Sequence, residues 1–178
     1  MGRERRITNT VGTIPSNTAL AGTVTTDTVN TKKLIYTGSN DIAAIITPDS
    51  IGLSSSTFWL YVAGKTPFVS RITGIHANYN DFDSEDPDAF AAATVKDYTL
   101  TLETAIPSCS ADACAYVRAG VAYSYIVDSG TATINGVTVP AGDSNAYQPY
   151  QTYSNRPKLQ PVSYVAASSA DVFISEEL

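Results

Sequence analysis

The 178-residue sequence has little charge, one histidine, one tryptophan and one methionine. Charged residues make up 16% of the chain, against roughly 25% in an average globular protein. This low charge, in a chain rich in threonine, valine and tyrosine, argues against a coiled coil, a helical bundle and a charged disordered tail. No apolar run approaches the ~20 residues of a membrane-spanning helix, so we expect no membrane partner.

Motifs for catalysis are also missing. Any Ser-His-Asp site would have to use His76, the only histidine, and the sequence has no nucleophile elbow for it. There is no phosphate-binding loop, dinucleotide fingerprint or zinc-protease motif. We therefore expect a structural His76, no cofactor and no enzymatic activity.

The two cysteines, Cys109 and Cys114, are too few for a zinc site with one histidine, and their spacing is not that of a C-x-x-C redox motif. The spacing would allow a small disulfide-closed loop in an oxidising setting. In a reducing cytoplasm we expect free thiols. The basic start of the chain runs into the polar residues 7–13, so we expect no signal peptide and synthesis in a host cytoplasm.

Serine and threonine are abundant instead, with 18 and 22 residues, and there are 11 tyrosines. Threonine, valine and tyrosine favour β-strands. Short alternating segments are separated by turn residues, and the clearest hairpin joins residues 131–134 to 137–139 through Asn135-Gly136. We predict a single all-β domain over residues 19–178, an antiparallel β-sandwich or jelly roll, in which residues 42–47 form a strand. One short helix is predicted over 87–93, and residues 1–18 are predicted to form an extended N-terminal arm.

Five of the 17 acidic residues lie in residues 81–88. The 12 acidic residues outside this segment are nearly balanced by the 11 basic residues of the chain. Without a broad basic face, specific nucleic-acid binding is not expected. The alternating carboxylates of Asp81, Asp83 and Glu85 are weak calcium candidates, because the segment lacks the glycine and the distal glutamate of an EF-hand loop. The alternatives are a solvated acidic loop, or one that meets the arginines of a neighbouring subunit's arm.

Two groups of residues are predicted to contact subunits or partners. The first is the basic arm, and the second is a strip in which tyrosines alternate with prolines, which together offer rigid amphipathic contact area. The alternatives for the strip are an irregular loop whose tyrosines cap the sandwich, or a sugar-stacking site. The residues are Arg3, Arg5, Arg6, Tyr147, Tyr150 and Tyr153.

The segments SGTATINGVTVPAGDS (129–144) and PVSYVAASSADVFI (161–174) resemble small β-rich structural virion proteins of tailed bacteriophages. The resemblance covers about the last fifty residues and rests on a hairpin followed by a terminal strand pair. It implies a protein that coats, cements or connects capsid and tail, located in the virion. No catalytic residue is carried over.

We therefore expect a capsid decoration or cement protein, with copies of itself and the major capsid protein as partners. A tail-tube or head–tail connector subunit is the alternative, since an acidic loop facing a lumen would let DNA slide without sticking. A carbohydrate-binding β-sandwich module is the alternative from another class of function.

Overall fold

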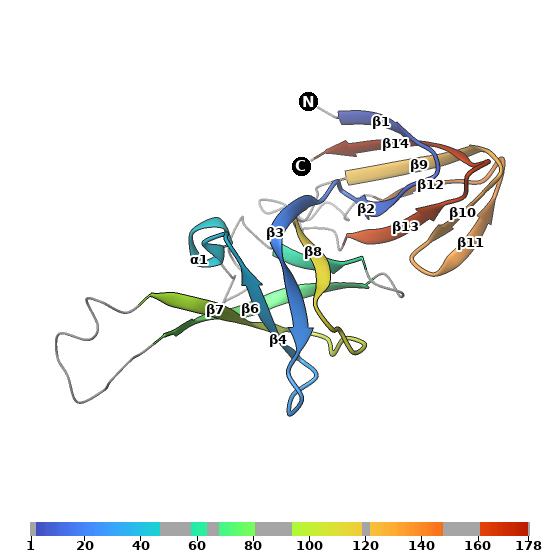
Figure 1. The fold of residues 1–178 in the computed structure, drawn as a ribbon. Helices are drawn as coiled ribbons and strands as arrows, with labels where there is room; N and C mark the ends of the chain where they lie inside the picture. The colour runs from blue at the N-terminus through green and yellow to red at the C-terminus, as the bar shows by residue number, and fades with distance from the viewer. Residues whose placement is uncertain are drawn as a thin grey trace, which may run out of the picture.

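The computed structural model describes residues 3–46, 58–63, 68–80, 94–118, 122–147 and 161–177, without the side chains of Arg3, Ala146, Tyr147 and Glu177. Within this part the chain is almost entirely β, its strands pair antiparallel, and there is one short helix, which confirms the predicted all-β class. The strands divide into two bodies, a closed barrel and a pair of four-stranded sheets (Figure 1).

The barrel contains six strands in the order β3-β4-β7-β6-β5-β8. Their bounds are β3 Thr18–Thr26, β4 Lys33–Gly38, β5 Phe58–Val62, β6 Phe68–Tyr79, β7 Val95–Leu102 and β8 Asp112–Arg118. Alternation along β5 shows how it is built: Phe58, Leu60 and Val62 enter the barrel core, whereas Trp59 and Tyr61 point outward. Closure leaves no free edge along these paired strands.

The second body consists of two facing sheets, with orders β1-β14-β9-β12 and β11-β10-β13-β2. Their bounds are β1 Arg3–Ile7, β2 Val11–Ile14, β9 Ala122–Ser129, β10 Thr131–Ile134, β11 Val137–Pro140, β12 Ser144–Tyr147, β13 Val162–Ala166 and β14 Asp171–Glu177. Side chains from both sheets form one buried cluster, in which Ile14, Val127 and Val172 are fully buried. We call this body the sandwich.

The prediction of one sandwich over residues 19–178 did not anticipate this division. The six barrel strands lie between residues 18 and 118 of the sequence, and the sandwich takes its strands from both sides of that segment. The barrel is therefore inserted into the sandwich between β2 and β9. Figure 1 shows the two ends of the chain together on the sandwich.

The predicted extended arm over residues 1–18 is wrong for most of its length. β1 pairs with β14, with Arg5 opposite Ile174, and β2 pairs with β13, with Thr13 opposite Ser163. The physical reason is apolar burial: Ile7 is 7% exposed and Ile14 is fully buried in the sandwich core. These two segments look polar in the sequence, and they fold as strands because partner strands 148 or more residues away supply their backbone hydrogen bonds.

The helix also lies elsewhere than expected. Residues 87–93, predicted as helix, fall outside the described residues, whereas Ile42–Ile45 of the segment predicted as a strand forms α1. Asp41 begins this single turn, because its carboxylate accepts hydrogen bonds from the Ala44 amide at 3.2 Å and the Tyr98 hydroxyl at 2.9 Å. In the described part of the chain no helix has the length and apolarity needed to cross a membrane.

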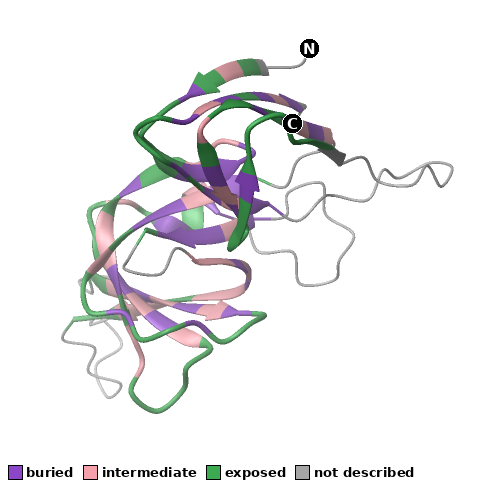
Figure 2. Cartoon of the chain, turned by 90° about the vertical axis from the view of Figure 1, so that its right-hand side faces the viewer, coloured by how far each residue is buried: buried purple, intermediate pink, exposed green. Residues whose placement is uncertain are grey.

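The outward face of β5 and β8 forms a further buried cluster, and Tyr61 on it interacts electrostatically with Tyr164 of the sandwich strand β13. Tyr61, Ala115 and Val117 are buried there, with Trp59 and Val69 packed beside them. Strand β13 of the sandwich contacts β6, and Figure 2 shows buried residues in both bodies. Burial raises the pKa of the Tyr61 hydroxyl above its usual range.

Candidate interaction surface

The outer face of the β1-β14-β9-β12 sheet combines exposed apolar side chains with charged ones. Phe173 of β14 lies opposite Ile126 of β9, and the two residues are 45% and 52% exposed. They point outward because they alternate with Val172 and Val127, which fill the sandwich core. Contiguous exposed apolar side chains, unlike single ones, mark a candidate site for contact with another protein.

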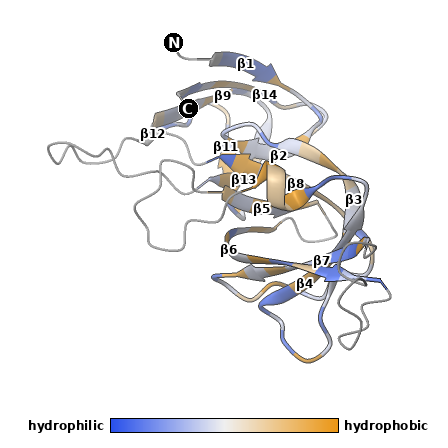
Figure 3. Ribbon diagram, turned by 90° about the vertical axis from the view of Figure 1, so that its left-hand side faces the viewer, coloured by the Kyte–Doolittle hydropathy of each residue, from blue (hydrophilic) through white to orange (hydrophobic). Residues whose placement is uncertain are grey.

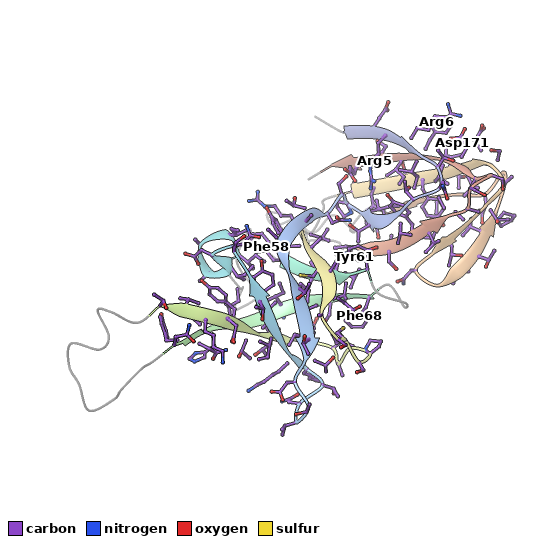
Figure 4. The ribbon with its side chains drawn as sticks, in the orientation of Figure 1. Arg5, Arg6, Phe58, Tyr61, Phe68 and Asp171 are labelled. Carbon is purple, nitrogen blue, oxygen red and sulfur yellow. The ribbon has the colours of Figure 1, made fainter. Side chains whose placement is uncertain are left out.

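Arg6 lies beside this apolar pair and contacts Phe173. Its guanidinium makes two hydrogen bonds to the Asp171 carboxylate and lies 5.4 Å from the centre of the Phe173 ring. Figure 4 shows Arg6 and Asp171 together at the end of the sheet. The Arg6 side chain remains 64% exposed despite both contacts, so it can also meet a partner.

These side chains surround an open hollow of about 670 Å³ across three strands. The hollow follows the exposed face from β1 over β14 to β9. It is lined by Glu4, Arg5, Arg6, Ser124, Ile126, Phe173, Ile174 and Ser175. It has an apolar centre and a rim with charges of both signs, which suits the surface of another protein.

The inner face of the same strands carries a buried ion pair. The Glu176 carboxylate, 2% exposed, lies 3.5 Å from the Arg5 guanidinium and accepts hydrogen bonds from the Ser16 amide at 2.9 Å and hydroxyl at 2.6 Å. Arg5 also donates to the Thr13 carbonyl and, at 3.0 Å, to the Tyr164 hydroxyl. Because Ser16 follows β2 on the way to β3, this network fastens the chain where it leaves the sandwich for the barrel.

The predicted contact residues therefore have different surroundings. Arg5 is engaged inside the sandwich and Arg6 lies on its outer face, while the side chain of Arg3 is not described. Tyr147 belongs to the edge strand β12, opposite Tyr123, and its side chain is not described either. Tyr150 and Tyr153 lie outside the described residues.

The calcium candidates Asp81, Asp83 and Glu85 also lie outside the described residues. Within the described ranges, no group of three or more His, Cys, Asp or Glu side chains could hold a metal ion. His76 is exposed on β6, where it pairs with Thr99 of β7.

The two thiols, Cys109 and Cys114, are free and lie in the barrel core. Burial raises the pKa of the Cys114 thiol to about 12, with the neighbouring Cys109 adding to the effect. Burial also raises the pKa of Cys109. A thiol with a raised pKa stays protonated near neutral pH and is therefore a poor nucleophile. These two cysteines act as core residues.

Glu4, Asp171, Phe173 and Glu176 were not identified as functional candidates from the sequence. The signal for two of them was the alternation in residues 171–176, which puts Phe173 on the face opposite Val172 and Ile174. The same alternation puts the acid Glu176 on the apolar face, and such a position calls for a basic partner. The identity of that partner, Arg5, depends on the strand order.

Comparisons of the chain with protein-family models, with curated proteins and with solved structures found no match.

Proposed function

We propose that this chain is a non-enzymatic structural protein that associates with copies of itself and with a larger protein lattice, as decoration or cement proteins of bacteriophage virions do. The observation that carries the proposal is the outer face of the β1-β14-β9-β12 sheet, where exposed Phe173 and Ile126 form an apolar centre within a charged rim. Large apolar side chains gathered at a hollow favour contact with another protein surface.

A virion role is the specific form of this proposal, and it is supported by the resemblance of residues 129–144 and 161–174 to small virion proteins of tailed phages. Decoration of a capsid is the preferred position in the particle. A tail-tube or connector subunit would use the same kind of sheet contact, in a closed ring.

A carbohydrate-binding module is less well supported by the described surface. Sugar rings stack on an open aromatic face, and Phe173, the exposed ring among the described side chains of this sheet, has the Arg6 guanidinium over it at 5.4 Å. The tyrosines on which that alternative depends are Tyr147, Tyr150 and Tyr153.

The test is the mass of the purified full chain in solution, measured by light scattering over a wide concentration range, with negative-stain microscopy of the same samples. A defined oligomer, ring or array is the expected result. A monomer at every concentration, with saturable glycan binding that is lost when the three tyrosines are changed to alanine, would contradict the proposal and favour the carbohydrate-binding module.

A further inference from the structure

The strand β1 forms a free edge of its sheet. It is the last strand in the order β1-β14-β9-β12, and its far side pairs with no strand in the described part of the chain. In Figures 1 and 2 it lies at the outer end of the sandwich with no element beyond it. Figure 3 shows it as hydrophilic. An exposed edge presents unpaired backbone donors and acceptors that another strand can use.

We propose that β1 pairs antiparallel with β1 of a second copy, centred on Arg5, so that two sheets join into one across a two-fold axis. This inference rests on the proposed function and specifies the contact by which two copies associate. Strand addition of this kind obtains affinity from main-chain hydrogen bonds and register from side chains.

The register of this β1–β1 pair is determined by which side chains point to the outer face of the sheet. A two-fold axis perpendicular to the sheet keeps the outer faces of both copies on one side, so Glu4 and Arg6 can oppose only outward-facing residues. Centring the pair on Glu4 places two glutamates opposite each other, and centring it on Arg6 places two arginines opposite each other. Centring it on Arg5 places Glu4 opposite Arg6 twice on the outer face, and it places the two Arg5 residues opposite each other on the inner face.

Opposite charges directly across neighbouring strands are favourable, and like charges are not. Glu4 is exposed and forms no ion pair within the described residues, and Arg6 is still 64% exposed while it binds Asp171. Both side chains are therefore available for the contact. The Arg5 residues on the axis face inward, and each is paired with Glu176 of its own chain.

This pairing also extends the candidate interaction surface. Glu4, Arg6 and Phe173 all line the hollow on the outer face, and the two-fold axis brings two such hollows next to each other along one continuous sheet. A partner protein would then meet a double site with the Glu4–Arg6 pairs at its centre.

The test is a charge-swap experiment on the full chain, with self-association measured by sedimentation equilibrium. In E4R and in R6E both cross-strand pairs become repulsive, and we expect the dissociation constant of each homodimer to rise by about tenfold or more. A mixture of E4R with R6E should form a mixed dimer about as tight as the wild type, because both pairs are attractive again. D128R makes the same charge change as E4R on exposed β9 and should leave association unchanged.

Circular dichroism and a thermal melt establish that each variant is folded. R6E loses the hydrogen bonds between Arg6 and Asp171 and could therefore fail to fold. In that case E4R alone tests the β1 pairing, because Glu4 makes no such contact among the described residues. If E4R and D128R each self-associate as tightly as the wild type, the β1 pairing is overturned and the proposed function still stands. A wild type that stays monomeric at all concentrations would overturn the β1 pairing, and together with the saturable glycan binding described above it would overturn the proposed function as well.

Discussion

At the scale of single residues, two ion pairs join the same two strands and differ in the face they occupy. Arg5 and Glu176 lie inside the sandwich, where the glutamate is 2% exposed, and Arg6 and Asp171 lie on the outer face. Removing one partner of a buried pair leaves a charge without compensation, whereas an exposed charge is screened by water. The two pairs therefore form a matched comparison.

The substitution Glu176→Gln should lower the free energy of unfolding by about 3–5 kcal/mol, because the Arg5 charge stays in a site with little water. The substitution Asp171→Asn should lower it by about 1 kcal/mol at most. Urea unfolding followed by circular dichroism measures both. Equal losses would show that the inner network does not fasten the sandwich.

The Cys114 thiol should make the protein less stable at alkaline pH. Its pKa is about 12 in the folded protein and 9.0 in the absence of burial, so above pH 9 only the unfolded chain loses this proton. The contribution is fully present below pH 9 and declines by about 1.4 kcal/mol per pH unit as the pH rises toward 12. Ionisation of this one group therefore favours the unfolded state throughout that window.

Cys114→Ala should remove this share of the pH dependence. Between about pH 8 and about pH 10.5, the loss of unfolding free energy should be roughly 2 kcal/mol smaller in the variant than in the wild type. Urea unfolding at both pH values provides the comparison, and the constant cost of the missing sulfur cancels in the difference. An identical pH dependence in the two proteins would contradict the prediction.

At the scale of elements, the hairpin of β10 and β11 was predicted from the sequence and is confirmed. Residues 131–134 pair with 137–140, and Asn135 and Gly136 have φ angles of 49° and 82°. The prediction was possible because two residues with positive φ determine this turn locally.

Elements that depend on distant partners could not be predicted in this way. The sequence of β1 has charges at positions 3–6, and only its pairing with β14 makes it a strand. The segment that starts at Ile42 has the apolar character of a strand, and Asp41 converts it to a helical turn with help from Tyr98, which lies 57 residues away. The same limit applies to the site: Arg5 and Arg6 were singled out, but Glu176 and Asp171 could not be assigned to them.

The strand β2 depends on a glycine because of a close approach. A Cβ atom at Gly12 would lie 2.6 Å from the Tyr164 hydroxyl of the neighbouring strand. Gly12→Ala should therefore displace Tyr164, weaken its hydrogen bond with Arg5, and cost about 1–3 kcal/mol of stability. Thermal unfolding measures the loss.

The matched control is Gly74→Ala in the barrel strand β6, where the nearest atom to a Cβ would be 3.4 Å away on Thr101. This distance is close to ordinary contact, so the control should change the midpoint of thermal unfolding much less. A larger effect at Gly74 than at Gly12 would contradict the role given to the Tyr164 contact.

At the scale of the whole molecule, the two bodies have separate cores, and the barrel is one continuous segment inside a discontinuous sandwich. Deleting residues 1–14 removes β1 and β2 together with the buried Ile7 and Ile14. No barrel strand is touched. The two bodies should therefore respond differently to the same deletion.

Hydrogen exchange resolved by peptide measures this difference. In the deletion variant, peptides from residues 94–118 should keep most of their protection, and peptides from residues 122–147 and 161–177 should lose it. The full chain is the reference. Uniform loss of protection in both groups would show that the bodies unfold as a single unit.

The pairing of the first strand with the last also sets an order of events during synthesis. The ribosome produces β1 before its partner β14, which emerges only after the barrel strands and six further strands, so β1 has no partner while the barrel forms. A chain released before residue 171 has a barrel but no place for β1 to pair. Only copies translated through β14 form this edge, so under the proposed β1 pairing an incomplete copy has no edge with which to join a second copy.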